Sequence, residues 1–238
     1  MRYQFIICKV LQKEAYFCAA RSKNTIDIVL MEQGLHNDPD KLRSAVQKAL
    51  DVTADVAGRG YDASLLGYGL CSNGIVGLKA TIPIIIPRGH DCITLLLGSK
   101  EKYLQYFEAH GGVYWYSTGW INDSMQPGKD RYEQTLRQYV EKYGQDNAQY
   151  LMEMEQNWMK EYERAVYIDW GFPCRDQEKD YTKQCAQFLG WSYDEIKGDP
   201  GLMQRLLDGQ WDQEDFLVVE PGQAISEDLT NPGIIKAK

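Results

Sequence analysis

The segment from Tyr61 to Gly98 constrains the fold more than any other part of the chain. It holds two short apolar runs, Ala63–Leu66 and Ile82–Ile86, which are rich in aliphatic residues and bounded by turn residues. Runs of this length and composition are typical of strands buried in a parallel sheet. A polar cluster follows each run, at residues 67–74 and 87–92. In open α/β sheets ligands bind beyond the carboxyl ends of the strands, so these clusters predict a binding or catalytic site.

The rest of the chain alternates predicted strands with predicted helices. We expect strands at 4–10, 25–31, 62–68, 81–86, 113–117, 165–170 and 216–219, and helices at 13–21, 39–55, 91–109, 180–189 and 202–207. This order predicts an α/β fold with a mostly parallel sheet and flanking helices. Apolar and aromatic residues at helical spacing predict a helical hairpin, or one kinked helix, near 121–164. We therefore expect a single α/β domain over residues 1–225 with this helical insertion, followed by a C-terminal tail at 226–238.

Charge and composition exclude several classes of protein. The net charge is −8, which argues against a nucleic-acid partner because such proteins usually present a basic face. No apolar stretch approaches the length of a membrane span, and the charged opening MRYQFIICKV is not typical of a signal peptide. Six cysteines in 238 residues are too few for a disulfide scaffold. We expect a cytoplasmic protein with reduced thiols and no membrane partner.

Four of the six cysteines follow predicted strands. Cys8, Cys71, Cys92 and Cys174 lie at or just past a strand's carboxyl end, and His90 shares the loop of Cys92. Because the carboxyl ends of parallel strands meet at one edge of a sheet, we expect these side chains to lie near one another. Thiolates with an imidazole form the ligand set of zinc or of an iron–sulfur cluster. A zinc-bound thiolate stays deprotonated at neutral pH and is a nucleophile for alkyl transfer.

The same residues allow two other interpretations. The chain has no C-x-x-C, so the spacing forms no metal motif of its own. Cys71 or Cys92 could act as the nucleophile of a thiol enzyme with His90 as the base, and a helix that begins at Cys92 would lower the pKa of its thiol. Alternatively, the cysteines are small buried side chains, since free Cys is among the most buried residue types.

Residues beside the cysteines suggest an anion site. Arg88 could bind a carboxylate or phosphate through two parallel hydrogen bonds, or form a salt bridge with one of the many acidic residues. Ser72, Asn73 and Gly74 could present backbone amides to an anion, although tight-turn chemistry explains them equally well. The pattern is neither a GxGxxG nor a P-loop, so it gives no specific indication of nucleotide binding.

The aromatic residues of the insertion suggest a protein-binding surface as an alternative to core packing. Tyrosine and tryptophan recur between residues 126 and 164, and both are common anchors of protein interfaces. This composition is compatible with a metal-free adaptor or with a homo-oligomer face.

Several stretches of the chain resemble one known family. LLGYGLCSNGIVGLKA, IIIPRGHDCITLLLGSKEKY and YWYSTGW are similar to the signature of DUF1638, a family of unknown function from anaerobic bacteria and methanogenic archaea. FIICKV and QGLHNDPDKLR also resemble it, so the similarity covers roughly residues 4–220.

The resemblance implies a link to corrinoid-dependent methyl transfer. The partner would then be a small-molecule thiol or methyl donor, or a corrinoid or methyltransferase protein. The chain would be a metal-dependent methyl or thiol transferase, a protein that supports one, or a metal-free adaptor. The family's opening is closer to A-C-E-V-L, whereas Lys9 follows Cys8 here, so an acidic ligand or base at that position is missing.

Overall fold

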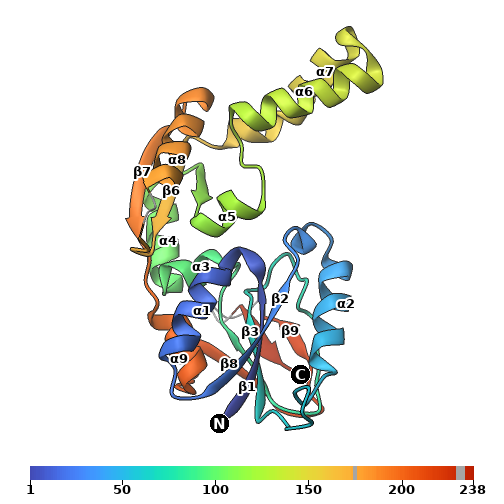
Figure 1. Ribbon diagram of the computed structural model, residues 1–238, viewed down its shortest axis with the longest axis vertical. Helices are drawn as coiled ribbons and strands as arrows, with labels where there is room; N and C mark the ends of the chain where they lie inside the picture. The colour runs from blue at the N-terminus through green and yellow to red at the C-terminus, as the bar shows by residue number, and fades with distance from the viewer. Residues whose placement is uncertain (174–175, 229–233) are drawn as a thin grey trace. The chain divides into compact units, whose positions relative to one another are not determined.

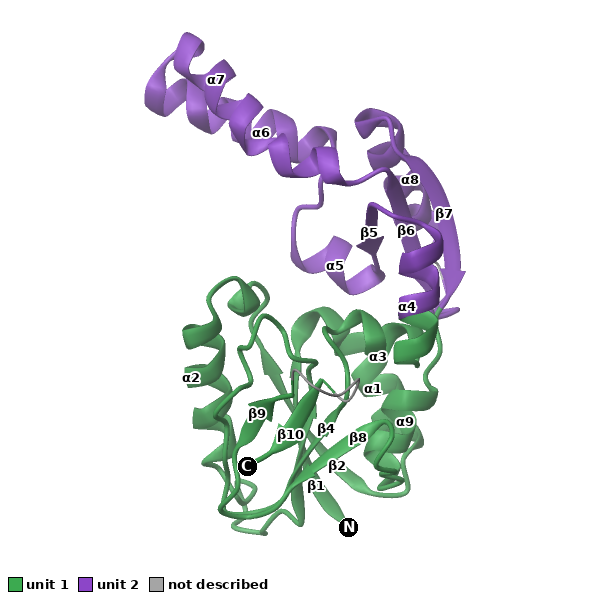
Figure 2. Cartoon of the chain, turned by 180° about the vertical axis from the view of Figure 1, so that it is seen from behind, with its two compact units in different colours: residues 1–103, 198–238 green, residues 104–197 purple. Residues whose placement is uncertain are grey.

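The chain divides into two compact units. The structure, a computed structural model, describes residues 1–173, 176–228 and 234–238. Unit 1 comprises residues 1–103 and 198–238, and unit 2 comprises residues 104–197 (Figure 2). The central sheets are mostly parallel and flanked by helices, which confirms the predicted fold class. The sequence predicts one domain over residues 1–225 with a helical insertion near 121–164; in the structure the inserted unit spans residues 104–197 and carries a sheet of its own.

Unit 1 is built on a five-stranded sheet. β1 pairs in parallel with β2 and β3, β3 pairs in parallel with β4, and β8 is antiparallel to β4 at one edge. β1, β3 and β4 are almost entirely buried, as expected for strands covered on both faces. The carboxyl ends of these three strands therefore share one edge of the sheet. In spatial order the strands are β2 (Thr25–Met31), β1 (Arg2–Cys8), β3 (Ala63–Gly67), β4 (Ile84–Pro87) and β8 (Phe216–Val219).

Helices cover both faces of this sheet. α1 and α9 lie side by side on one face and α2 covers the other (Figure 1). Asp38 caps α2 by accepting a hydrogen bond from the Lys41 backbone at 3.2 Å, with Pro39 in the first turn, as the sequence predicted. The helical elements of unit 1 are η1 (Lys9–Leu11), α1 (Gln12–Arg21), η2 (Leu35–Asn37), α2 (Pro39–Leu50), α3 (Ile93–Leu97) and α9 (Gly201–Asp208). Helix α4 (Lys100–Ala109) begins in unit 1 and continues into unit 2 at residue 104.

Two regions of unit 1 differ from the sequence prediction. The helix expected at 91–109 is divided into α3 and α4, because Gly98 adopts a φ of +74° that ends α3. The region expected as a tail contains β9 (Ile225–Glu227) and β10 (Ile235–Ala237), which form an antiparallel pair.

Unit 2 has a smaller parallel sheet. Its order is β5 (Val113–Tyr116), β6 (Arg164–Asp169) and β7 (Ser192–Lys197). α6 (Lys129–Tyr143) and α7 (Gln145–Glu155) form the predicted helical hairpin, and Gly144 joins them with a φ of +80°. The other helical elements are α5 (Thr118–Asp123), η3 (Asn157–Glu161) and α8 (Asp176–Leu189). In the described part of the chain, no helix combines the length and apolar character needed to cross a bilayer.

Candidate functional site

Three cysteines gather at the carboxyl edge of the unit 1 sheet. Cys8 is the last residue of β1, Cys71 lies in the turn after β3, and Cys92 follows β4 just before α3. Charge on Cys8 or Cys71 raises the pKa of Cys92, and charge on any of the three raises the pKa of Tyr68. The structure therefore brings Cys8, Cys71 and Cys92 to one edge of the sheet, and their role as ligands stays a prediction.

The turns after β3 and β4 are joined through their backbones. The Leu70 amide donates to the Gly89 carbonyl at 2.8 Å, and the Cys71 amide donates to the His90 carbonyl at 2.9 Å. A Cβ atom on Gly69 would lie 2.6 Å from the Asp91 nitrogen and 2.7 Å from the Gly89 oxygen. Because both contacts are with backbone atoms, only glycine permits this approach. Gly69 thus holds the loops of Cys71 and Cys92 together.

The turn that carries Cys71 is left-handed. Cys71, Ser72 and Asn73 have φ values of +46°, +55° and +65°, an uncommon conformation for residues other than glycine. The Arg43 guanidinium donates to the Asn73 carbonyl at 3.0 Å and to the Val76 carbonyl at 2.6 Å. A tight turn held by Arg43 therefore accounts for these residues, and the anion site at residues 72–74 stays a prediction.

Gly74 closes this turn against helix α2. Its amide donates to the Cys71 carbonyl at 3.0 Å, and a Cβ atom would lie 2.5 Å from Leu42 Cδ2. The turn therefore packs directly on the helix, and a side chain at Gly74 would have to displace Leu42.

Burial keeps the thiols protonated in this arrangement. Desolvation raises the pKa of Cys71 to about 12 and raises the pKa of Cys92 well above its ordinary value. The charge of Asp91 raises both further. The expectation that the helix would lower the pKa of Cys92 is therefore wrong, because α3 has only five residues and desolvation outweighs its dipole. Neither thiol is activated as a nucleophile in this state.

Tyr68 is a site residue that the sequence analysis missed. It is the first residue after β3 and is 3% exposed. Among the described residues its buried hydroxyl has no hydrogen-bond partner. Burial raises the pKa of Tyr68, and charge on Cys8, Cys71 or Cys92 raises it further. A buried unsatisfied hydroxyl costs about 1–3 kcal/mol and calls for an explanation such as a bound ion or ligand.

Asp91 and His36 extend the site. The Asp91 carboxylate accepts hydrogen bonds from the Ile93 amide at 2.9 Å and from the Tyr103 hydroxyl at 3.2 Å, and burial raises its pKa. Burial lowers the pKa of His36, partly opposed by the negative charge of Asp91. His90, the predicted ligand or base, is an exposed residue whose carbonyl accepts from Cys71.

Arg88, the predicted anion anchor, makes hydrogen bonds to backbone carbonyls. Its guanidinium donates to the carbonyl of Gln213 at 3.1 Å, to that of Phe216 at 3.2 Å and to that of Ile235. These bonds tie the end of β4 to β8 and β10, and the anion-binding role of Arg88 stays a prediction. Another predicted ligand, Cys174, lies outside the described residues.

The donor atoms do not already form a metal centre. Within residues 1–173, 176–228 and 234–238, no three side chains of His, Cys, Asp or Glu are arranged to hold a metal ion. None of the five described cysteines forms a disulfide. The site is therefore a cluster of protonated soft donors, with the predicted metal set still a prediction.

Comparison with known proteins identifies the family. No curated protein and no solved structure matches this chain. One family model matches residues 30–207, described as a protein of unknown function (DUF1638). The matched range includes the turns after β3 and β4 with Tyr68, Cys71 and Cys92. The chain therefore belongs to the DUF1638 family.

Proposed function

We propose that unit 1 binds a soft metal ion through Cys8, Cys71 and Cys92 and acts in, or supports, methyl or thiol transfer. The observation that carries this proposal is the grouping of these thiols around the buried, unpartnered hydroxyl of Tyr68. Of the two metal groups that the sequence suggested, zinc is favoured over an iron–sulfur cluster. Three protein ligands and an open fourth position are typical of catalytic zinc, whereas clusters usually take four cysteines.

The electrostatics of the cluster favour a cation. Ionising several desolvated thiols beside Asp91 is costly, since each negative charge raises the pKa of its neighbours. A divalent cation offsets that cost, and its binding releases the thiol protons. Cys8, Cys71 and Cys92 would supply the sulfur ligands of such an ion. Bound zinc would keep a thiolate ready for alkyl transfer, and the Tyr68 hydroxyl could donate to a ligand sulfur.

A metal-free thiol enzyme is less well supported. Such an enzyme needs a thiol whose pKa lies near or below neutral pH, as when a neighbouring base or cation stabilises the thiolate. Burial instead raises the pKa of Cys71 and of Cys92, and His90 is exposed. The family match does not identify a substrate. The corrinoid link and a reducing, cytoplasmic setting are therefore parts of the proposal.

A second candidate function is a metal-free adaptor. The α6–α7 hairpin exposes Tyr143, Tyr150 and Met154 to solvent, and exposed aromatic and methionine side chains favour protein interfaces. The partner would be a methyltransferase or corrinoid protein, or a second copy of this chain.

Elemental analysis tests the proposal. Full-length protein purified without oxygen should contain about one zinc ion per chain and show no visible colour. Cys71→Ser and Cys92→Ser should lose the metal, whereas Cys18→Ser should keep it. Cys18 is the matched control because it is a buried cysteine of helix α1 rather than of the strand edge. Folded protein that binds no zinc, even when zinc is added under reducing conditions, contradicts the proposal and favours the adaptor.

A further inference from the structure

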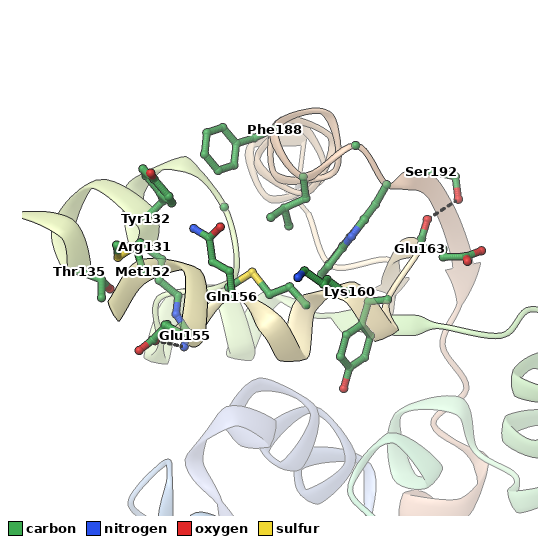
Figure 3. Close-up of a pocket in the computed structure, with 16 residues that line it drawn as sticks. Arg131, Tyr132, Thr135, Met152, Glu155, Gln156, Lys160, Glu163, Phe188 and Ser192 are labelled. Atoms are coloured by element: carbon green, nitrogen blue, oxygen red, sulfur yellow. Dashed lines mark hydrogen bonds and ion pairs between the residues drawn. The ribbon is translucent and has the colours of Figure 1, made fainter. Parts of the chain in front are cut away.

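A large cavity lies within unit 2 (Figure 3). Its volume is about 830 Å³, within the range of sites that bind small molecules. One side of α6 lines it, together with the end of α7, η3 and the turn from α8 into β7. None of the predicted site residues lines it, so the cavity belongs to a different part of the molecule from the thiol cluster.

Two pairs of aromatic rings line the cavity. Tyr132 of α6 contacts Phe188 of α8 with 5.8 Å between ring centroids. Tyr162 and Trp191 form the other pair, also at 5.8 Å. Met152 and Met159 add soft, polarisable side chains to the lining. Since aromatic rings pack well on other flat rings, this lining favours a flat aromatic ligand.

Two basic side chains, Arg131 and Lys160, line the cavity, and only Arg131 forms an ion pair with a described carboxylate. Arg131 forms an ion pair with Glu155 at 3.2 Å, and the other Glu155 oxygen accepts from the Tyr139 hydroxyl at 2.8 Å. The Arg131 guanidinium also lies 5.4 Å from the centroid of the Trp158 ring. Arg131 is thus already held by its neighbours.

Lys160 is the second cation of the lining. Its ammonium donates to the Asn157 side-chain oxygen at 2.8 Å, and no carboxylate in the described part of the chain pairs with it. The Glu163 carboxylate lies at the opposite end of the cavity from the Tyr132–Phe188 pair (Figure 3). Lys160 therefore supplies a positive charge that an acidic ligand can use.

We propose that this cavity binds a small, flat aromatic molecule that carries a carboxylate or a comparable anionic group. The ring lies against the aromatic pairs, and the anionic group accepts from the Lys160 ammonium. This site is independent of the metal proposed for unit 1.

Binding of a matched pair of probes tests the proposal. The anion 2-naphthoate and the uncharged 2-naphthamide have the same ring system, and each is titrated into the full chain by calorimetry. We expect saturable binding of both, with naphthoate about fivefold tighter because it gains a charge-assisted hydrogen bond. Lys160→Gln should abolish that preference and leave naphthamide binding unchanged. Lys142→Gln, a control on α6 outside the cavity, should change neither affinity.

Phe188→Ala separates ring recognition from charge recognition. Phe188 is partly exposed, so its truncation should leave the unit folded by circular dichroism while weakening both probes. Cys71→Ser should bind both probes normally, which distinguishes this site from the metal site. The absence of saturable naphthoate binding to the folded chain would overturn the proposal. A Lys160→Gln variant that keeps the preference for naphthoate would also overturn it.

Discussion

Two buried tyrosines of unit 2 have hydrogen-bond partners for their hydroxyls, whereas Tyr68 of unit 1 has none among the described residues. The hydroxyl of Tyr116 donates to the Pro127 carbonyl at 3.0 Å, and that of Tyr167 bonds with Thr118 Oγ1 at 2.9 Å. Tyr68 is about as buried as these residues, yet its hydroxyl lacks a partner among the described residues. Since folded proteins normally pair buried polar groups, this difference points to Tyr68 as a residue kept for a ligand.

The cysteines show the same contrast. Cys185 lies on α8 in the core of unit 2, and its sulfur is so close to Gly128 that a Cβ there would approach it to 2.6 Å. Cys71 lies in a left-handed turn at a strand end, beside other thiols. Whether a cysteine lies within a helix or at the end of a strand therefore distinguishes a packing cysteine from a candidate ligand better than its burial does.

The largest effect should come from the backbone contact that assembles the unit 1 site. Gly69→Ala places a Cβ within 2.7 Å of backbone atoms of the neighbouring loop, so we expect a loss of about 3 kcal/mol in the free energy of unfolding. Gly111→Ala in unit 2 is the matched control, because its Cβ would meet no atom within 4 Å. Urea unfolding measures both. Equal midpoints for the two variants would contradict the close approach of the loops.

The paired tyrosines provide a direct test of the comparison between units. Tyr167→Phe leaves Thr118 without its buried partner and should cost about 1–2 kcal/mol. Tyr68→Phe removes an unsatisfied hydroxyl and should be neutral or stabilising by up to about 1 kcal/mol in metal-free protein. Urea unfolding after treatment with a chelator distinguishes the two outcomes. A marked loss of stability in Tyr68→Phe would show that the hydroxyl has a partner in solution.

The sequence predicts those strands and helices whose own residues carry a clear pattern. The buried runs that form β3 and β4, and the Asp38 cap of α2, follow from apolar composition and helix chemistry. β7 was missed because SYDEIK is a polar edge strand whose residues are all partly or fully exposed. The second sheet was also missed, since strand order depends on which strands pair and not on their individual sequences.

The sequence predicts which strand ends carry the candidate site, whereas it does not predict the electrostatics there. Strand ends placed Cys8, Cys71 and Cys92 in one neighbourhood, as parallel topology requires. The raised pKa of Cys92 depends on desolvation by tertiary contacts, which a helix-start argument does not include. The role of Arg88 depends on carbonyls more than 120 residues away. The sequence does not identify Tyr68 as a site residue, because whether a buried hydroxyl has a hydrogen-bond partner depends on the folded chain.

A smaller effect concerns alkaline pH. The pKa of Cys71 rises from 9.0 to about 12 on folding, so above pH 9 the unfolded chain releases a proton that the folded chain keeps. The corresponding stability is present below pH 9 and is lost as the pH rises toward 12. In chelator-treated protein, Cys71→Ala should reduce the loss of stability between pH 8 and pH 10 by about 1 kcal/mol. Ser72→Ala, the neighbouring non-titrating control, should retain the full loss.

The smallest effect concerns His36 and mildly acidic pH. Burial lowers the pKa of His36 below its ordinary 6.5, so near that pH the unfolded chain binds more protons than the folded chain. The stability that follows is present above pH 6.5 and is lost as the pH falls. His36→Gln should therefore make unit 1 less sensitive to acid. Between pH 7.5 and pH 5.5 the variant should lose less free energy of unfolding than the wild-type chain, by under about 1 kcal/mol. The comparison stops at pH 5.5 because burial raises the pKa of Asp91, which opposes the trend at lower pH. Urea unfolding at the two pH values provides the measurement. An unchanged or steeper acid dependence in His36→Gln would show that His36 is not desolvated beside Asp91.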